Sequence, residues 1–547
     1  MKFFNMMMTA AAMTFAAQGV CAELPDFWAP PKQVKLIEFS WNSPDTAYLR
    51  KNIEQMEKLT PYQGIGIHVR ATGVHNGKKV KCFHRSITGK IPWKYEWFKQ
   101  AIKDLKNTRF RKFTDNFIRV NTCPGNVDWF SDEDWKTVCN NFSIMSRIAK
   151  ECGLKGLALD MEMYEYPMMT YPKDATRSLD EYRKKARQRG REFADAVFGP
   201  YPDMRFFCFF WLSHTQNFYF RISDPDQYDL AAYFINGIYD NLPPEAMIID
   251  GHEEAGYRAS SEMAYMKLRD DVMRKFHMII DKKNINKVKT QTQLSVAFYL
   301  DAYFEQTKQI KGWTESVLPN KKERPLDVFN RNMNYARLYT DDYIWTWGEK
   351  GSWWKKENHW ETKAPGITAV VKNAIDPEGF VNARYEVAKA NGFGKNLLLN
   401  PEFAGTVSQN KTVAKWKFWQ SAASKGSYGL ETGVDGNCIY NKNSARAAFF
   451  QSVKVKAGEV YMLRAMAKIE GKDSSATLTV RWKNRAGQWE SLILDRTVVF
   501  EKPDADGWCR AELKIAVPPS STALVFMLNS VSVDGKVSFR NPELYKL

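Results

Sequence analysis

Short β-rich runs alternate with longer amphipathic stretches from residue 34 to about residue 350 of this chain. One helical stretch, Asp132–Cys152, follows Ser131 as an N-cap and ends before Gly153, as surface helices commonly do. Eight β-runs that alternate with helices predict a parallel sheet closed into a (β/α)8 TIM barrel. The expected strands are Val34–Phe39, Gly64–Arg70, Asn116–Asn121, Leu154–Glu162, Phe206–Ser213, Ala246–Glu253, Leu294–Asp301 and Tyr343–Trp347.

The pattern changes near Gly392, and no helical stretch follows it. Short runs in which apolar and polar residues alternate appear instead, separated by Gly and Pro. This pattern predicts a β-sandwich of the jelly-roll type. We therefore expect a barrel at residues 23–392 and a β-sandwich at residues 393–547, after an N-terminal segment at residues 1–22.

The N-terminal segment has the composition of a secretory signal peptide. Lys2 supplies the positive charge, Phe3–Ala17 the apolar region, and Val20-Cys21-Ala22 a small-residue cleavage site. A lipid anchor through Cys21 is disfavoured because Gln18 and Val20 fit a bacterial lipobox poorly. No later apolar run is long enough to span a membrane. A periplasmic or secreted protein is therefore expected.

The formal charge of +17 bears on the partners, because basic exported proteins meet anionic glycans, anionic surfaces or nucleic acid. Lys and Arg are dispersed along the chain rather than gathered in a basic arm, so nucleic acid is not expected as a partner. The cysteines and histidines show no metal-ligand spacing, and no Gly-rich phosphate loop follows a strand. We therefore predict neither a metal nor a cofactor.

Two carboxylates follow the fourth β-run, in the segment Lys155–Tyr164. Side chains alternate faces along a strand, so Asp160 and Glu162 are expected on the same side. Two acids at the end of a buried strand are costly unless they are solvated, paired or used. Paired carboxylates in different environments are what cleavage of a glycosidic bond requires.

The other strands bring further polar and aromatic residues to the same end of the barrel, where barrel enzymes have their active sites. Asp250 and Glu253 from the sixth run, then Asp301 and Glu349, compete as the second catalytic carboxylate. Carboxylates together with aromatic rings suit sugars, whose apolar faces stack on tryptophan while their hydroxyls bind acids and amides. The residues expected to bind substrate are His68, Arg70, Asn121, Tyr164, Trp211, Tyr299, Asp301, Trp345, Trp347 and Glu349.

Structural roles compete with each of these assignments. The acids of the fourth run could pair with Arg70 or cap a helix, and Glu253 or Asp301 could open a helix, where acids are favoured. His68 on a β-run could be a satisfied core histidine, and Trp345 and Trp347, which share parity, could pack in the core.

The segment Gly156–Glu162 resembles the strand-four motif of the chitinase-like glycoside hydrolases, which ends in Asp-x-Glu. The resemblance implies that Asp160 orients the substrate or stabilises charge and that Glu162 protonates the leaving oxygen. Lys155 and Ala158 stand where that family has earlier acidic residues, so half of the motif is present. The segments 249–253 and 343–350 look similar to bacterial barrel hydrolases.

The C-terminal region resembles carbohydrate-binding modules of the CenC-like type. The likeness lies in Asn396–Phe403, similar to their opening strand, and in Gln451–Tyr461, similar to their central hairpin. Phe539-Arg540-Asn541-Pro542 departs from the usual acidic ending, which leaves a calcium site there without support. The resemblance makes four tryptophans candidates for stacking on sugar: Trp416, Trp419, Trp482 and Trp489.

These observations together predict an exported glycoside hydrolase that cleaves a complex glycan with Glu162 as general acid and Asp160 as its partner. If Arg70 faces inward, the basic balance favours an acidic or sulfated host glycan as its substrate. One alternative is a non-catalytic glycan-binding protein with a degenerate barrel. Another is a different hydrolase on the same barrel, such as a deacetylase, which would need a metal or an activated nucleophile. The sequence leaves open the sugar and linkage, retention or inversion, the second carboxylate and the oligomeric state.

Overall fold

The structure is a computed structural model that describes residues 34–213, 230–433, 436–456, 458–518 and 521–547. The predicted signal peptide at residues 1–22 lies outside these ranges. So does His214, which directly follows the fifth predicted strand. No helix within the described ranges combines the length and the apolar character needed to cross a membrane.

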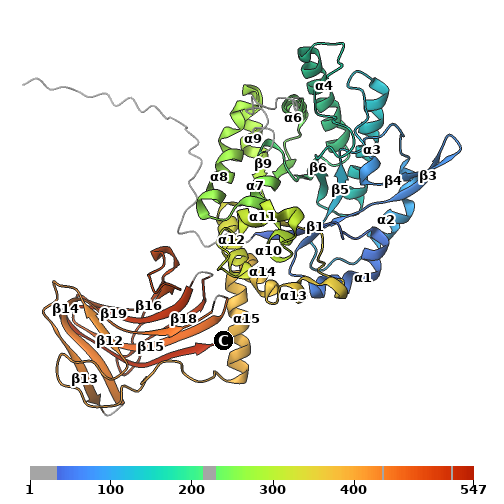
Figure 1. Ribbon diagram of the computed structural model, residues 1–547. Helices are drawn as coiled ribbons and strands as arrows, with labels where there is room; N and C mark the ends of the chain where they lie inside the picture. The colour runs from blue at the N-terminus through green and yellow to red at the C-terminus, as the bar shows by residue number, and fades with distance from the viewer. Residues whose placement is uncertain (1–33, 214–229, 434–435, 457, 519–520) are drawn as a thin grey trace, which may run out of the picture. The chain divides into compact units, whose positions relative to one another are not determined.

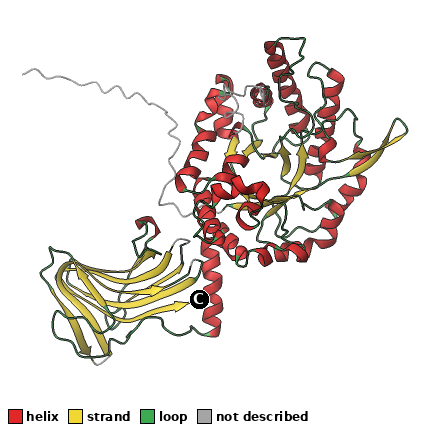
Figure 2. Cartoon of the chain, viewed as in Figure 1, coloured by secondary structure: helices red, strands yellow, loops and turns green. Residues whose placement is uncertain are grey.

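The N-terminal part contains a parallel sheet of nine strands among its described residues, in the order β10-β11-β1-β2-β5-β6-β7-β8-β9. The strands curve into a nearly closed barrel, and helices surround them (Figures 1 and 2). The predicted combination of a parallel α/β part and an antiparallel β part is confirmed at this level. The strands are β1 (Lys35–Ser40), β2 (Gly64–Ile67), β5 (Phe117–Asn121), β6 (Gly156–Asp160), β7 (Arg205–Cys208), β8 (Met247–Asp250), β9 (Thr292–Leu294), β10 (Val296–Tyr299) and β11 (Tyr343–Gly348).

Amphipathic helices follow these strands along the chain. Their apolar stripes lie against the sheet, as in α3, where Trp135, Phe142 and Ile148 are buried. The expected helix Asp132–Cys152 is present as α3 and ends one residue earlier than predicted. The helices are α1 (Thr46–Leu59), α2 (Lys99–Lys106), α3 (Asp132–Glu151), α4 (Leu179–Phe198), α6 (Ala231–Asn241), α7 (Glu253–Arg258), α8 (Glu262–Met273), α9 (Ile285–Gln291), α10 (Leu300–Phe304), α11 (Lys311–Val317), α12 (Pro325–Tyr339), α13 (Trp360–Lys363), α14 (Ile367–Ile375) and α15 (Pro377–Asn391).

The seventh predicted strand, Leu294–Asp301, is interrupted in the structure. β9 pairs with β8 and β10 pairs with β11, and Ser295 separates the two. The Ser295 N–H donates to the carbonyl of Asp250 at 2.8 Å, so the backbone stays bonded to β8 across the interruption. The chain then enters α10 at Leu300, which places Asp301 in the first turn of a helix.

Aromatic rings fill the inside of the barrel. Phe39 from β1 lies at the centre, with its ring centroid 5.3 Å from that of Phe207, 4.9 Å from Phe209 and 5.6 Å from Trp345. All four rings are almost fully buried. Because the interior is packed, a ligand can reach only the ends of the strands.

A β-hairpin of strands β3 (Ala71–His75) and β4 (Lys78–Cys82) follows β2 and projects from the barrel (Figure 1). Its turn contains Asn76 at φ 49° and Gly77 at φ 73°, the left-handed conformations that tight hairpins require. The hairpin packs on the 3-10 helix η2 (Tyr95–Phe98) through Gly73, where a Cβ atom would lie 2.1 Å from the Trp97 ring.

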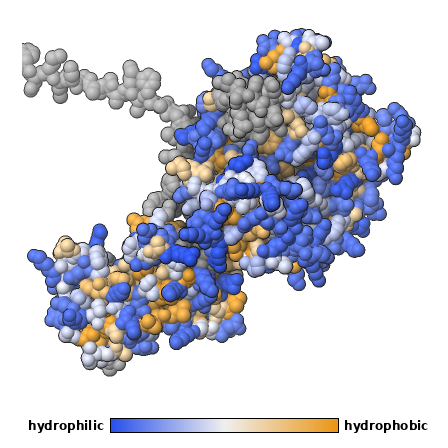
Figure 3. Space-filling view, in the orientation of Figure 1, coloured by the Kyte–Doolittle hydropathy of each residue, from blue (hydrophilic) through white to orange (hydrophobic). Residues whose placement is uncertain are grey.

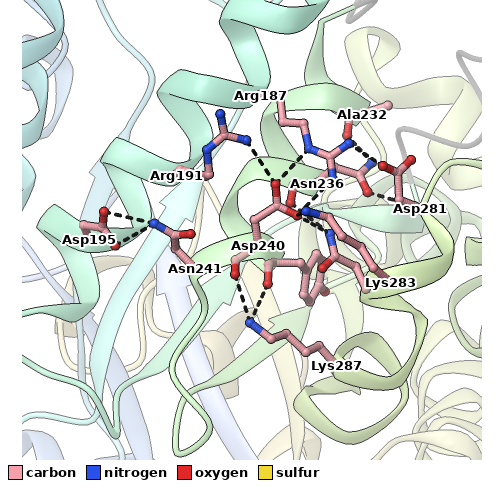
Figure 4. A network of polar contacts seen from close by, with 12 residues as sticks. Arg187, Arg191, Asp195, Ala232, Asn236, Asp240, Asn241, Asp281, Lys283 and Lys287 are labelled. Atoms are coloured by element: carbon pink, nitrogen blue, oxygen red, sulfur yellow. Dashed lines mark hydrogen bonds and ion pairs between the residues drawn. The ribbon is translucent and has the colours of Figure 1, made fainter.

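Polar contacts tie the outer helices α4 and α6 to the segment that follows α8 (Figure 4). The Asp240 carboxylate accepts hydrogen bonds from Arg187 Nε at 2.8 Å and Asn284 Nδ2 at 2.8 Å. Arg191 and Lys283 pair with it at 3.2 and 2.9 Å. These charge-assisted bonds hold the pKa of Asp240 well below its usual range although burial opposes them.

The C-terminal part is an antiparallel sheet of eight strands among its described residues. Its buried side chains form a cluster of their own, from Leu398 to Leu544, whereas the cluster of the barrel ends at Ile375. The strands are β12 (Lys417–Gln420), β13 (Ser427–Gly433), β14 (Gly436–Lys454), β15 (Val460–Glu470), β16 (Ser474–Asn484), β17 (Arg496–Val499), β18 (Cys509–Ala516) and β19 (Ser521–Lys546).

Asparagines of the motif that opens this part have structural roles. Asn396 accepts hydrogen bonds from the backbone of Leu398 and Leu544, both at 3.1 Å. Asn400 closes a turn by accepting from the Ala404 N–H at 2.8 Å. The motif therefore connects the beginning of this C-terminal part, hereafter the β-domain (residues 393–547), to its last strand.

Candidate functional site

Asp160 lies at the carboxyl end of β6 and faces the inside of the barrel. Its carboxylate accepts hydrogen bonds from Asn121 Nδ2 at 3.1 Å and from the Tyr164 hydroxyl at 3.3 Å. The other oxygen accepts from the Glu162 N–H at 2.9 Å. The Asp160 side chain is almost fully buried, and burial raises its pKa although the hydrogen bonds and the charge of Arg119 oppose this.

Glu162 lies beyond the end of β6, which corrects the expectation that the strand continues through it. The turn closed by Asp160 and the Glu162 N–H stops the strand, so strand alternation does not set the direction of the Glu162 side chain. The residue is exposed at the rim. Even so, loss of hydration raises the pKa of Glu162, and the charge of Asp160 raises it further.

Glu253 is the third carboxylate of the site. It opens α7, directly after β8, and its Oε1 accepts a hydrogen bond from the Tyr257 hydroxyl at 3.0 Å. Burial holds the pKa of Glu253 well above its usual range, with further contributions from the charges of Glu162 and Asp160. Carboxylates that destabilise one another's ionised forms share one local environment. The structure thus brings together three of the acids that the sequence singles out.

Arg119 is a member of the site that the sequence analysis did not select. It comes from β5, two residues before Asn121, and therefore faces the inside of the barrel as Asn121 does. Its Nη1 donates to the carbonyl of Ser40 at 2.7 Å, and its guanidinium lies 4.9 Å from the ring centroid of Trp347. Its charge acts on both Asp160 and Glu253 and favours their ionised forms. The sequence could have indicated this, because Arg119 and Asn121 are two residues apart in one strand and so point to the same side.

Asp250 and Asp301 have both carboxylate oxygens engaged by the protein. Asp250 is fully buried and accepts from the Ser213 N–H at 2.8 Å, the Ser213 hydroxyl at 2.6 Å and the His252 N–H at 3.1 Å. Asp301 accepts from the backbone N–H groups of Glu349 and Lys350, at 2.7 and 2.9 Å. In this arrangement both aspartates fix the loops that leave the strands.

Two of the tryptophans expected at the site have no exposed ring surface. Trp345 stacks on Phe209 with ring centroids 4.6 Å apart and donates from Nε1 to the Gly251 carbonyl at 2.8 Å. The Trp211 indole donates to the Tyr239 hydroxyl at 3.3 Å. Trp347, one layer above Trp345, is half-buried and borders the site. Trp345 thus belongs to the aromatic floor inside the barrel, whereas Trp211 packs against Phe206 and Tyr239.

Further polar residues border the carboxylates on two sides. Tyr299 is buried, and its pKa is raised by burial and by the charge of Glu349. His68, which directly follows β2, is 5% exposed, and its Nδ1 has no hydrogen-bond partner among the residues that the structure describes, whereas Arg70 beyond it is exposed. Tyr164 is 53% exposed, which leaves its ring accessible beside Asp160.

The four candidate tryptophans of the β-domain divide into two pairs. Trp416 and Trp482 are core residues, with exposures of 4% and 0%. Trp419 and Trp489 are 53% and 46% exposed. Trp489 lies against Arg481, whose guanidinium is 4.2 Å from the ring centroid. Only the second pair presents ring surface to solvent.

No model of a protein family matches the sequence, and no curated protein matches it. Among solved structures, the chain is similar to the module TmCBM61 in complex with β-1,4-galactotriose, with 11% identity and a TM-score of 0.21 over 28% of this chain and 100% of that one. It is similar to the C-terminal family 22 carbohydrate-binding module of Clostridium thermocellum Xyn10B, with 14% identity and a TM-score of 0.21 over 29% and 96%. A third likeness is to the enzymatically active domain of the bacteriophage CBA120 tailspike protein 4, with 15% identity, a TM-score of 0.21 and coverage of 24% of this chain and 20% of that one.

Proposed function

We propose that the protein is an exported glycoside hydrolase whose site lies at the carboxyl ends of a (β/α)8 barrel. The observation that carries the proposal is the convergence of Asp160, Glu162 and Glu253 above a packed aromatic floor: the charge of Asp160 raises the pKa of Glu162, and the charges of both raise the pKa of Glu253. Counting β9 and β10 as one strand interrupted at Ser295 leaves the eight strands of such a barrel.

In this proposal Glu162 is the general acid. The raised pKa of Glu162 favours the protonated carboxyl that a general acid needs, and its exposed position at the rim gives a glycosidic oxygen access to it. Asp160 accepts three hydrogen bonds that fix its carboxylate, and it stabilises the positive charge that develops on the sugar ring.

Glu253 is the second carboxylate, acting either as nucleophile or as the base that activates water. It comes from α7, beyond β8, and so approaches from another part of the rim than Glu162. Tyr257 fixes its orientation through a hydrogen bond. Burial and the charges of Glu162 and Asp160 raise the pKa of Glu253 and oppose the ionised form that both roles require, whereas the Tyr257 hydrogen bond and the charge of Arg119 favour that form. Asp250 and Asp301, with both oxygens used, are positioning residues.

The β-domain, residues 393–547, is proposed to be a jelly-roll carbohydrate-binding module. Its exposed Trp419 and Trp489 are the rings that can stack on a sugar, and the buried Trp416 and Trp482 are assigned to the core.

The test is hydrolysis of a panel of neutral and anionic polysaccharides, measured as the rate at which reducing ends are released. The parent protein is compared with Glu162→Gln, Glu253→Gln and the control Glu54→Gln, which removes an exposed carboxylate from the outer helix α1. We expect the first two variants to lose about 10²–10⁴-fold in kcat and the control to retain the parent rate.

Two further measurements separate the roles. A substrate with a good leaving group needs little protonation, so it restores much of the rate to Glu162→Gln but not to Glu253→Gln. If Glu253 is a nucleophile, azide rescues Glu253→Ala and gives a glycosyl azide. Unchanged turnover in Glu162→Gln refutes the assignment, and a parent that binds glycans without cleaving any is the non-catalytic glycan-binding alternative.

A further inference from the structure

The segment that follows β2 is strongly basic. Residues 70–85 contain five basic side chains and no Asp or Glu. All five are exposed, and within the described residues a single ion pair involves them, between Arg85 and Glu165 at 3.4 Å. Because the segment leaves the carboxyl end of a barrel strand, it lies on the same rim as the three carboxylates. The five side chains are Arg70, Lys78, Lys79, Lys81 and Arg85.

The β3–β4 hairpin holds two of these lysines in a fixed direction. Gly73 faces Trp97, and so does the cross-strand partner of Gly73, Val80. Side chains alternate along a strand, so Lys79 and Lys81 face away from Trp97 and toward solvent. On the face drawn in Figure 3, much of the surface is hydrophilic and apolar residues form only scattered patches.

At the inner end of the hairpin two histidines stack. The rings of His68 and His84 have centroids 4.5 Å apart and planes 31° apart. In both rings Nδ1 is buried without a hydrogen-bond partner among the described residues. Burial and the charges of Arg119 and Arg70 lower the pKa of His68 to about 2 and that of His84 to about 3, so both rings are neutral. A buried and unpartnered Nδ1 is a polar atom that a ligand can satisfy.

We propose that the β3–β4 hairpin, Arg70, Arg85 and the His68–His84 pair form a subsite for an anionic sugar residue of the glycan chain. The inference rests on the proposed function and specifies its substrate: a polysaccharide that carries carboxylate or sulfate groups. Arginines bind such groups through paired hydrogen bonds, and exposed lysines attract them as point charges.

The carboxylates give this subsite a direction. An anionic substituent close to the Asp160 carboxylate would be repelled, whereas the same group near Arg70 would be attracted. Arg85 connects the two regions, because its guanidinium lies 5.2 Å from the ring centroid of Tyr164. The glycan would therefore lie with its anionic group on the hairpin and the scissile bond at Glu162.

The experiment compares binding to matched pairs of polymers by isothermal titration calorimetry at physiological ionic strength. The pairs are dextran sulfate with dextran, and carboxymethyl cellulose with hydroxyethyl cellulose. The variants are Arg70→Gln and the control Arg109→Gln. Arg109 is also exposed, but it precedes β5 and so lies at the opposite end of the barrel. Both variants remove one positive charge, so a general effect of the net charge of +17 affects them equally.

We expect Arg70→Gln to weaken binding of the anionic polymers about tenfold and Arg109→Gln to change it by less than about twofold. The polymer pair with the larger loss identifies the group as sulfate or carboxylate. The proposal is overturned if both variants lose the same affinity for the anionic polymers, or if the parent binds the uncharged polymers as strongly as the anionic ones. The proposal is also overturned if Arg70→Gln weakens the binding of a single-stranded oligonucleotide as much as it weakens the binding of the anionic polymers. Binding is measured without turnover, so failure of the hydrolase assignment leaves this result intact, and the reverse also holds.

Discussion

Glu38 gives the sharpest test of how burial acts in this fold. It lies in the middle of β1, is 2% exposed, and its Oε2 has no hydrogen-bond partner among the described residues. Loss of hydration raises the pKa of Glu38 from 4.5 to about 7, although a hydrogen bond with Ser40 and the charge of Arg119 oppose the change. The perturbation is Glu38→Gln, which keeps the shape of the side chain and removes its titration.

The sign follows from proton linkage. The folded protein holds the Glu38 proton more tightly than the unfolded chain, so the stabilisation is complete below pH 4.5 and is lost as the pH rises through about 7. The window between the two pKa values is about 2.5 pH units wide, and each unit is worth about 1.36 kcal/mol. The parent should therefore lose about 3 kcal/mol relative to Glu38→Gln between these limits.

The assay is urea denaturation of the parent and Glu38→Gln at a series of pH values across the window. Other acids titrate in both proteins, so the difference between the two free energies of unfolding isolates Glu38. The control Glu54→Gln removes an exposed carboxylate from the outer helix α1 and measures the general effect of losing one acidic side chain. Parallel curves for the parent and Glu38→Gln would refute the argument that Glu38 is deprived of hydration.

Two other substitutions test structural contacts by denaturation. Asp240→Asn should cost about 1–3 kcal/mol at neutral pH, because it leaves the partners in Figure 4 without their carboxylate. The folded pKa of Asp240 is lowered, so this difference should shrink as the pH falls below about 4; a constant difference contradicts the ionic role. Gly73→Ala should cost about 1–3 kcal/mol because its Cβ would overlap Trp97. The control Gly312→Ala, in α11 with open space around it, should be neutral or stabilising, and equal effects would argue against the Trp97 contact.

The sequence predicts the arrangement of strands well where apolar runs end in recognisable turns. β6 and α3 follow directly from buried apolar residues, Ser131 and Gly153. The β3–β4 hairpin was missed although Asn76-Gly77, a strong hairpin signal, marks its turn. The interruption at Ser295 had no signal at all, because it depends on a change of neighbouring strand from β8 to β11.

The sequence predicts which types of residue face the site, but not how deeply each of them is buried. Alternation along a strand places Trp345 and Trp347 on the same side, and both do face the inside of the barrel. It does not say that Trp345 lies a layer lower, covered by Phe209, while Trp347 reaches the rim. The same limit applies to Asp250, whose oxygens are taken up by Ser213 and His252 from segments that no local pattern connects.

The place of β7 between β6 and β8 has a consequence for stereochemistry. Glu162 follows β6 and Glu253 follows β8, and these two strands stand two strand spacings apart, about 10 Å. Glycosidases that retain configuration hold their carboxyl groups about 5 Å apart, and those that invert hold them about 6.5–9.5 Å apart. The spacing of the strands is therefore compatible with retention and with inversion, and the positions of the two carboxyl groups determine which of them occurs. The substitution Glu253→Asp would widen the separation of the two carboxyl groups and so favour the inverting course, without moving any strand.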